Sequence, residues 1–363
     1  MHKRNRKWFN LIFASLLIAL LSGYGSDHAI AYEGFGATTP GGLGRKVVRV
    51  TNLNDSGPGS FREAVSRGGR TVVFDVTGEI ALKSHVFVKG SFMTVDGSTA
   101  PPPGIILRNR GLIIRGSKGA HDVIIQGIRV RDSTGDCIQI AERAFNVVID
   151  RVSTYGCGDG NIDITTRAHD ITVSWSILVG GAIHKLMLIK YNASRISLHH
   201  NLYVRGSRNP QVSLEGSGPA TDTTVDMRNN VVWDWGFSYG TLVRYGPWAN
   251  VINNYYENPG GDAIDKLQAI IVCRGDGVET PSSFLWCDQG VAAAAARAYA
   301  SGNVSRNGAD LTMVGTELVP FVAPPVETQD ACTGANLVLE HAGVRPADLI
   351  DQGHLSAISL PPC

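Results

Sequence analysis

The stretch from Asn146 to Val212 decides the fold: NVVIDRVSTYGCGDGNIDITTRAHDITVSWSILVGGAIHKLMLIKYNASRISLHHNLYVRGSRNPQV. Short runs rich in Val, Ile and Thr alternate here with Gly, Asn and Asp, a pattern typical of short strands bounded by turns. The apolar segments recur at nearly constant spacing, and so do the polar residues between them. Internal repetition of this kind indicates a coil of repeated turns.

The repeat extends beyond this stretch in both directions. When the segments IIQGIRV, VIDRVST, VSWSILV, LHHNLYV, MRNNVVW and VINNYYE are aligned, the intervals are 24, 24, 25, 29 and 24 residues. A second set, CIQIA, NIDIT and LMLIK, runs alongside at intervals of 24 and 25. Strands that repeat together at this period predict an all-β fold, a right-handed parallel β-helix. The longer interval predicts an inserted loop at 215–223. A β-propeller is excluded because its repeat is about 40 residues or more.

Three asparagines occupy equivalent positions in successive repeats. They are Asn201, Asn230 and Asn254, and equivalent side chains in a parallel coil lie about 4.8 Å apart. We expect them to form an inward polar stack in which each amide bonds its neighbours. Of the adjacent His199 and His200, one is expected to point inward in a structural role.

The chain begins with features of an export signal. Residues 1–31 contain four basic side chains near the start, an apolar run from Leu11 to Leu21 and a small-residue cleavage site at Ala29–Ala31. We expect residues 1–31 to be a secretory signal peptide and 32–363 a single domain, because the apolar run is about half the length of a membrane-spanning helix. An N-terminal membrane anchor is the alternative. The expected location is outside the cell or in a periplasm.

The net charge of the chain limits the classes of partner that it is expected to bind. Removal of residues 1–31 reduces 33 basic and 32 acidic residues to 29 and 31. A nearly neutral protein is not expected to bind nucleic acid through bulk phosphate attraction.

The six cysteines are disulfide candidates in an oxidising compartment. The pairs Cys273–Cys287 and Cys332–Cys363 are guesses, whereas Cys137 and Cys157 either join neighbouring segments or are buried apolar residues.

The two ends of the domain depart from the repeat. Ser60 and Glu63 form a capping box, so a short helix is expected to cover the N-terminal end of the coil. The periodicity fades after Glu257, where residues 292–300 are expected to be helix or loop. NLVLEHAG is expected to form a short helix that closes with Gly343, within a C-terminal tail that packs along the coil and caps its far end.

A column of charged residues follows the repeat. Steps of one repeat from Asp136 reach or adjoin Asp159, then His184 and Lys185, then Arg208. The column spans about 14 Å, a length suited to an extended anionic polymer. Lys185 and Arg208 form its basic end, and Arg can bind a carboxylate with two parallel hydrogen bonds.

The acidic end of this column has three carboxylates. Asp136, Asp159 and Asp163 would repel one another at neutral pH unless a cation neutralised them, and oxygen ligands suit calcium. The alternative is that Asp159 caps a glycine-rich turn and Asp163 faces solvent. NIDIT, however, places Asp163 at a polar position between two inward isoleucines.

At these residues the sequence resembles the pectate lyase family of polysaccharide lyases. The motifs are EGFGATTPGG with VTNLNDSGPGSFREAV, VIDRVSTYGCGDGNIDIT, HKLMLI followed by RISLHHNLY, and SRNP with NNVVWDWG and VINNYYENP. They span Tyr32 to about Pro259, and AGVRPADLID fits the family's tail. The resemblance implies calcium-dependent β-elimination of polygalacturonate to 4,5-unsaturated oligogalacturonates.

The resemblance also implies roles for particular residues. Asp136, Asp159 and Asp163 match calcium ligands, Lys185 matches a substrate-binding lysine of the catalytic group, and Arg208 matches the proposed base, although the usual pKa of arginine exceeds 12. The sequence departs from the family pattern at Thr134, where some members have a further aspartate, and at Ser213, where some have a second arginine. Arg244 or Arg205 could replace that arginine, and His184 could also contact substrate.

Two other functions stay open. A polygalacturonase-like hydrolase would use paired carboxylates and water, but the sequence offers no second convincing carboxylate pair. A non-catalytic β-helix that binds acidic glycans or acts as an adhesin stays open because Ser213 stands where some family members have a second arginine. In each case the expected partner is an acidic polysaccharide, with neither nucleic acid nor membrane as a partner of the mature chain, which is expected to be monomeric.

Overall fold

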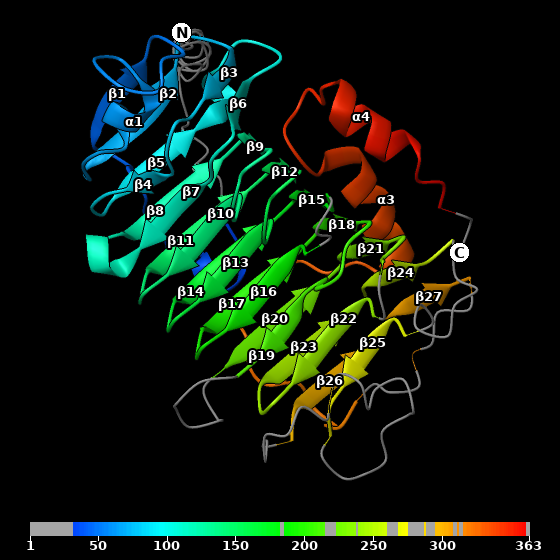
Figure 1. Ribbon diagram of the computed structural model, residues 1–363. Helices are drawn as coiled ribbons and strands as arrows, with labels where there is room; N and C mark the ends of the chain where they lie inside the picture. The colour runs from blue at the N-terminus through cyan, green and yellow to red at the C-terminus, as the bar shows by residue number, and fades with distance from the viewer. Residues whose placement is uncertain are drawn as a thin grey trace, which may run out of the picture. The chain divides into compact units, whose positions relative to one another are not determined.

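The computed structural model describes residues 32–181, 185–214, 223–236, 239–259, 268–274, 287, 295–307, 311 and 315–360. From Tyr32 onward the chain forms one compact unit. In the described part of this unit the strands stack as three parallel sheets that run the length of a coil (Figure 1). The expected all-β parallel β-helix is therefore confirmed.

Sheet A has ten strands, sheet B nine and sheet C eight, each hydrogen-bonded to the equivalent strand of the next turn. The strands of sheet A are β1 (Lys46–Val50), β2 (Arg70–Phe74), β5 (Met93–Asp96), β8 (His121–Gln126), β11 (Phe145–Asp150), β14 (His169–Ser174), β17 (Ser194–His199), β20 (Thr224–Arg228), β23 (Trp248–Ile252) and β26 (Arg297–Ser301). Those of sheet B are β3 (Gly78–Ala81), β6 (Ile105–Arg108), β9 (Arg129–Arg131), β12 (Ser153–Tyr155), β15 (Ile177–Val179), β18 (Leu202–Val204), β21 (Val231–Trp233), β24 (Tyr255–Glu257) and β27 (Val304–Arg306). Those of sheet C are β4 (Val86–Val88), β7 (Leu112–Arg115), β10 (Ile138–Ala141), β13 (Ile162–Thr165), β16 (Met187–Lys190), β19 (Gln211–Ser213), β22 (Thr241–Arg244) and β25 (Ile270–Val272).

Each complete turn thus contributes three strands, whereas the sequence repeat indicated two. A segment such as VIDRVST is two strands in different sheets, because Arg151 adopts a left-handed conformation (φ 47°) that bends the chain between β11 and β12. Inward residues such as Ile138, Ile162 and Met187 stack in register and are fully buried. This stacking forms the apolar core of the coil.

The asparagine stack is confirmed in the turn between sheets A and B. Asn201 donates to Asn230 at 3.0 Å, Asn230 to Asn254 at 2.9 Å, and Asn254 to Asn303 at 3.1 Å. Each of these amides also bonds backbone groups, as Asn230 does with the carbonyl of Leu198 at 2.9 Å. All the side-chain polar groups of the asparagine stack are paired, which is the condition under which a buried amide stabilises a fold.

The N-terminal end is covered as the capping box predicts. The hydroxyl of Ser60 accepts from the amide of Glu63 at 3.2 Å, and the Glu63 carboxylate accepts from the amide of Gly59 at 2.8 Å, so that α1 (Phe61–Ala64) begins. Phe61 is fully buried and stacks on Phe74 of β2. Three short 3₁₀ turns are η1 (Gly34–Gly36), η2 (Gly97–Thr99) and η3 (Gly116–Lys118).

The coil continues further than its sequence pattern indicated. The expectation of helix or loop at residues 292–300 is wrong for 297–300, which belong to β26 (Arg297–Ser301) and pair with β23. Strands β25 and β27 also follow Glu257, and with β26 they form the last strand of each of the three sheets. The loop predicted at 215–223 lies almost wholly outside the described residues.

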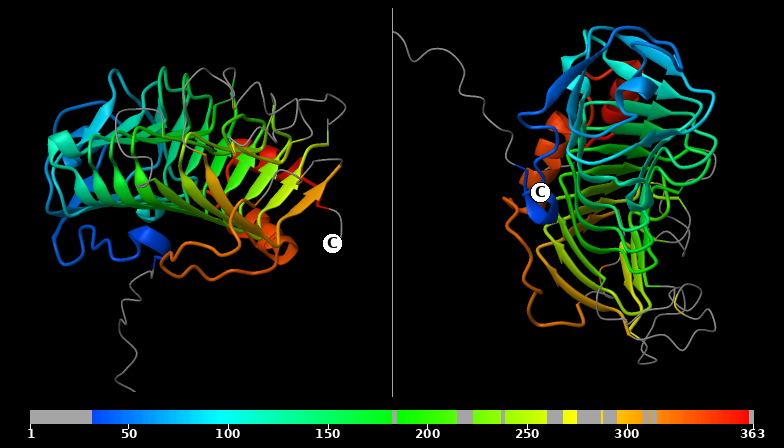
Figure 2. Two further views of the ribbon diagram at one scale, coloured as in Figure 1. Left: turned by 90° about the horizontal axis from the view of Figure 1, so that it is seen from below. Right: turned by 90° about the vertical axis from the view of Figure 1, so that its left-hand side faces the viewer.

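The C-terminal tail packs along the coil through two helices, α3 (Ala331–His341) and α4 (Leu349–Ser356) (Figure 2). Gly343, at φ 78°, follows α3 as expected. Apolar side chains of α3, including Val338 and Ala335, cover Ile177 and Leu202 on the outer face of sheet B. The tail therefore lies against the side of the coil.

Arg129 and Arg131 of β9 bind α4. Arg129 is fully buried and lies 2.9 Å from Asp351, and Arg131 lies 2.7 Å from Asp348. In the part of the chain that the structure describes, no helix is long and apolar enough to cross a membrane.

Candidate functional site

The candidate site lies where the turns from sheet B enter sheet C. Asp136 precedes β10, Asp159 precedes β13, Lys185 precedes β16 and Arg208 precedes β19. Lys185 pairs with Ser207 in an isolated parallel bridge, so Arg208 lies one residue further along its turn. The predicted column is therefore present, and it follows the axis of the coil.

Asp136 and Asp163 are held by the backbone of neighbouring turns. The Asp136 carboxylate accepts from the amide of Gly160 at 2.9 Å and from Gln139 at 2.9 Å, and that of Asp163 accepts from the amide of Leu188 at 3.1 Å. A Cβ at Gly160 would lie 2.1 Å from an oxygen of Asp163. Glycine at this position therefore lets the turn approach both carboxylates.

The three carboxylates interact electrostatically. Asp163 is 6% exposed, and its burial, followed by the charge of Asp136 and then of Asp159, raises its pKa to about 8, although Arg208 opposes the shift. Burial also raises the pKa of Asp136, with a further contribution from Asp159. The site thus contains carboxyl groups that are costly to ionise together.

Lys185 is the direct partner of one of these carboxylates. Its ammonium lies 2.7 Å from Asp159, and both side chains are partly exposed. The acidic and basic ends of the column therefore touch, an arrangement that the sequence spacing did not predict. His184 lies outside the described residues.

A disulfide joins the two turns that carry the acidic residues. Cys137 and Cys157 are bonded, and they lie next to Asp136 and two residues before Asp159. This settles the alternative left open for these cysteines. The guess of Cys273–Cys287 is also confirmed, whereas the guess of Cys332–Cys363 involves residue 363, outside the described residues.

The two replacement arginines occupy different places. Arg244 of β22 pairs with Ser213 of β19 in the strand register, one turn along from the position where an arginine was expected. Burial raises the pKa of Tyr239 to about 12, and the charges of Arg208 and Arg244 both oppose this, so the two guanidinium groups lie near the same ring. Arg205 instead forms an ion pair with Asp234 at 3.2 Å, and the structure does not bring it to the column.

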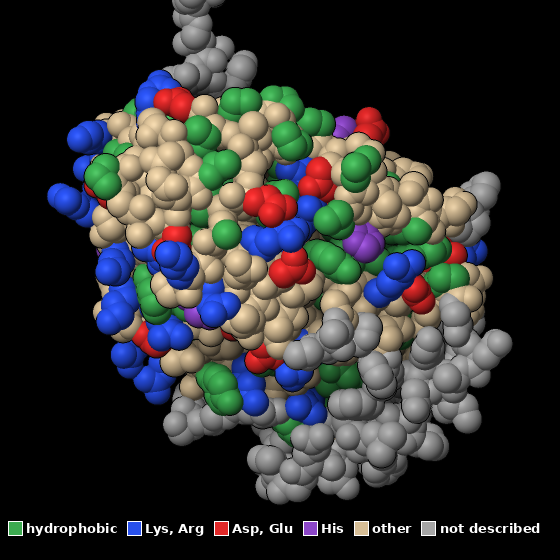
Figure 3. Space-filling view, turned by 45° about the horizontal axis from the view of Figure 1, so that its top comes forward, with side chains coloured by type: hydrophobic (Ala, Val, Ile, Leu, Met, Phe, Trp, Pro, Cys, Tyr) green, Lys and Arg blue, Asp and Glu red, His purple; other side chains and the backbone are tan. Residues whose placement is uncertain are grey.

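One residue of the site was missed by sequence reasoning. Gln139, whose amide bonds Asp136, was visible as the outward residue of the CIQIA pattern. Tyr239 donates to Gln211 at 3.0 Å and is buried. Figure 3 shows the distribution of charge over one face of the molecule, where Lys and Arg gather along one edge and Asp and Glu are scattered among other side chains.

The donor chemistry of the acidic residues fits a hard divalent cation, but their arrangement is not that of a complete metal site. In the described residues, no group of three or more His, Cys, Asp and Glu side chains is arranged to hold a metal ion. Asp159 is turned to Lys185. The raised pKa of Asp163 nevertheless marks a position where positive charge would be stabilising.

Comparisons with known proteins identify relatives of the chain. The chain is 35% identical to probable pectate lyase C of Aspergillus terreus over 256 residues, which cover 66% of this chain and 58% of that protein. It is 39% identical to probable pectate lyase C of Emericella nidulans over 234 residues, which cover 62% and 52%. The chain thus spans just over half the length of these relatives. No family model matches the chain.

Solved structures share the fold. The cedar pollen allergen jun a 1 superposes with a TM-score of 0.68 at 21% identity, covering 86% of this chain and 92% of the other. A Bacillus pectate lyase in complex with trigalacturonate superposes with a TM-score of 0.64 at 19% identity, covering 86% and 98%. By these similarities the chain is a homologue of proteins named pectate lyase and has their parallel β-helix fold.

Proposed function

We propose that the protein is a secreted, calcium-dependent pectate lyase that cleaves polygalacturonate by β-elimination. The observation that carries the proposal is the grouping of Asp136, Asp159 and Asp163 with Lys185 and Arg208 along one edge of sheet C. The identity to proteins named pectate lyase C supports the same assignment. The trigalacturonate in complex with the solved Bacillus neighbour is an acidic oligosaccharide of the class proposed here.

In this proposal the acidic residues would hold calcium. The ion, when bound, supplies positive charge that polarises the uronate carboxylate and acidifies the proton on the adjacent ring carbon. Asp136 and Asp163 are fixed by backbone amides, whereas Asp159 would have to exchange Lys185 for the cation. That exchange would release the Lys185 ammonium to bind a substrate carboxylate.

Arg208 is proposed as the base. It is half-buried and its charge is felt by Asp163 and Tyr239, so it lies beside the proposed ion site. A guanidinium group can accept a proton only in its neutral form, and arginine is normally protonated at any pH below about 12. The role therefore requires the guanidinium to lose its proton when substrate is bound. Arg244, one turn along from Ser213, is proposed to bind a second substrate carboxylate.

An absorbance assay tests the reaction. Polygalacturonate mixed with the protein and calcium should give the ultraviolet absorbance of 4,5-unsaturated uronates, and a chelator should abolish it. Arg208→Ala should lose nearly all of this signal, while Lys83→Gln, which changes an exposed side chain elsewhere, should retain it. Reducing ends without unsaturation would indicate a hydrolase, and binding without any product would indicate a non-catalytic glycan-binding protein.

Export and assembly state complete the proposal. We propose that residues 1–31 are removed on secretion and that the mature protein acts as a monomer. The amino-terminal sequence of protein recovered from the medium should begin at or near Tyr32, and sedimentation should give the mass of one chain. A start at Met1 or a dimer mass would contradict these two points without affecting the assigned reaction.

A further inference from the structure

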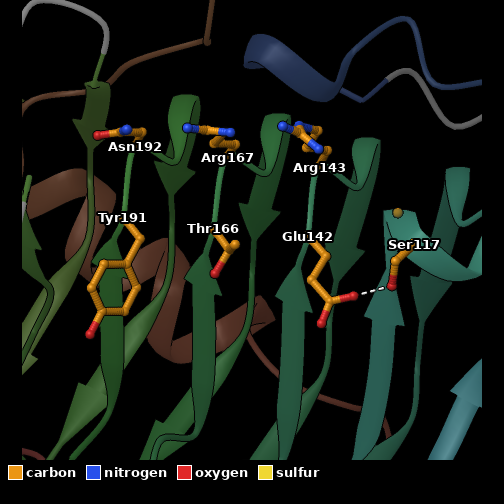
Figure 4. A pocket seen from close by; sticks show the side chains of 8 residues that line it. Ser117, Glu142, Arg143, Thr166, Arg167, Tyr191 and Asn192 are labelled. Carbon is orange, nitrogen blue, oxygen red and sulfur yellow. Dashed lines mark hydrogen bonds between the residues drawn. The ribbon is translucent and has the colours of Figure 1, made fainter. Parts of the chain in front are cut away.

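A groove lies at the opposite ends of the strands that carry the candidate site. It encloses about 590 Å³ and follows the corner where sheet C turns into sheet A (Figure 4). Its walls come from the equivalent turns after β10, β13 and β16, including Arg143, Arg167 and Tyr191. Asp163 of the acidic cluster lies in β13 (Ile162–Thr165) and precedes Thr166 of the groove by three residues, or about 10 Å along the strand. The groove and the site are therefore distinct.

The backbone at this corner does not favour the side chains found there. Two successive residues in each turn are left-handed: φ is 57° and 63° at Glu142 and Arg143, 54° and 61° at Thr166 and Arg167, and 56° and 61° at Tyr191 and Asn192. Glycine and asparagine adopt this conformation with least strain, and a β-branched or bulky residue is an outlier. Left-handed residues also occur at other corners of the coil, such as Arg151 between sheets A and B. The conformation therefore follows from the sharp bend at the corner, and its repetition places equivalent side chains of successive turns in rows.

Two arginines form one row of the groove. Figure 4 shows Arg143 and Arg167 at the same position of neighbouring turns, with Asn192 continuing the row. Both arginines are exposed, and successive turns are about 4.8 Å apart. Among the described residues, no ion pair is formed by either guanidinium. Two like charges at this spacing favour an anionic ligand between or along them.

The second row of the groove does not neutralise the positive charge of Arg143 and Arg167. Its side chains are Ser117, Glu142, Thr166 and Tyr191. It contains one acidic residue, Glu142, which accepts a hydrogen bond from Ser117 and lies 3.3 Å from Arg115. Because Arg115 already neutralises Glu142, the positive charge of the first row is left for a ligand. The groove therefore has the electrostatic character of a binding site for carboxylates.

Tyr191 provides an apolar surface at one end of the groove. It is 45% exposed, and the ammonium of Lys190 lies 4.6 Å from the centre of its ring. Exposed aromatic rings present a flat face to which the C–H face of a sugar can bind. Together with the arginine row, the ring makes a surface with the two chemistries that an acidic sugar polymer offers.

We propose that this corner groove is an accessory binding site for a second segment of an acidic polysaccharide chain. Arg143 and Arg167 bind carboxylates of successive or near-successive sugars, in the bidentate geometry available to guanidinium groups, and Tyr191 contacts a sugar ring. The inference rests on the proposed function only for the identity of the polymer. Binding there retains a long chain on the protein while another segment reaches the candidate site.

Affinity electrophoresis of the full chain in gels that contain polygalacturonate tests the proposal. All proteins carry Arg208→Ala so that cleavage does not change the polymer. Arg143→Gln/Arg167→Gln is expected to weaken binding about tenfold, as the loss of two exposed guanidinium–carboxylate pairs. Lys46→Gln/Lys83→Gln removes two exposed positive charges elsewhere and should leave mobility shifts close to those of the parent. In gels that contain fully methyl-esterified polymer, neither the arginine pair nor the lysine pair of substitutions should change the retardation of the protein.

The outcomes separate this site from the proposed lyase activity. Equal retardation of the Arg143→Gln/Arg167→Gln protein and its parent, or equal weakening by the lysine pair, overturns the accessory site. Weaker retardation of the Arg143→Gln/Arg167→Gln protein than of its parent in the esterified gel also overturns it, because the carboxylates would not be the groups recognised. If the protein binds through Arg143 and Arg167 but the Arg208-intact chain yields no unsaturated product, the accessory site stands and the lyase assignment fails. Circular dichroism of each variant confirms that the coil is folded.

Discussion

Lys185 lies 2.7 Å from Asp159, so a residue expected to bind substrate is the direct partner of a residue expected to bind metal. The contact joins two adjacent turns of the coil across the candidate site. A cation that competes for Asp159 would break this pair and release the ammonium. Metal binding and substrate binding are then coupled through one ion pair.

Lys185→Gln should therefore have opposite effects on the two ligands. Without the ammonium, Asp159 has lost its competing cation, and calcium affinity should rise about fivefold, the upper range for an exposed ion pair. Polygalacturonate cleavage should fall because a carboxylate-binding group is gone. Calcium titration by calorimetry measures the first effect and product absorbance the second. Lys83→Gln is the matched control, and unchanged calcium affinity in Lys185→Gln would contradict the coupling.

Asp163→Asn should change how stability depends on pH. A carboxyl whose folded-state pKa is raised to about 8 destabilises the fold once the pH exceeds its unfolded value, and the cost is complete above the folded value. The variant should match the parent near pH 3 and exceed it by about 1–3 kcal/mol at pH 8. Urea unfolding in the presence of a chelator measures this difference.

The control for that experiment is Asp75→Asn, because Asp75 is exposed in its pair with Arg49. The free energy of unfolding of Asp75→Asn should not rise comparably above that of the parent at pH 8. Added calcium should stabilise the parent more than Asp163→Asn if Asp163 is a ligand. A pH-independent difference between parent and variant would show that burial of charge is not the cause.

Asp351→Asn should be strongly destabilising. Asp351 lies 2.9 Å from Arg129 and 3.2 Å from Arg131, and removal of one partner leaves buried positive charge uncompensated. The expected loss is about 3–5 kcal/mol. Asp75→Asn breaks an exposed pair of 2.6 Å and should cost less than about 1 kcal/mol. Similar midpoints for the two variants in urea would contradict this assignment.

Asn230→Ala should destabilise the coil at the asparagine stack. The substitution removes the acceptor for the Asn201 side chain and backbone amide and the donor to Leu198. Buried groups left without partners give an expected loss of about 3 kcal/mol. Asn54→Ala, at an exposed position, is the control. Thermal unfolding that is unchanged in Asn230→Ala would show that water replaces the lost amide.

Much of the fold could be predicted from the repeat, because stacked turns require equivalent residues at a constant interval. Asn201, Asn230 and Asn254 were located correctly despite an interval of 29 residues between the first two. The third sheet was missed because Arg151 bends the chain without a glycine or proline to signal the corner. Strand β26 was missed because alanine has a low strand propensity, and pairing with β23 overrides that preference.

The site was partly predictable for the same reason. Positions along the column follow from the period, so Asp136, Lys185 and Arg208 were placed together. Side-chain direction does not follow from the period. Arg205 directly follows β18, three residues before Arg208, and its side chain pairs with Asp234 of the next turn. The contact of Lys185 with Asp159 also depends on the local shape of two turns.

The binding of α4 to β9 has a consequence for synthesis. Each strand of the coil pairs with the equivalent strand of a neighbouring turn, so turns can add in order as the polypeptide emerges. Arg129, by contrast, must wait for Asp351, 222 residues later. Until the last helix has left the ribosome, Arg129 and Arg131 lack their carboxylate partners. The coil therefore gains these contacts only when its carboxyl end has been made.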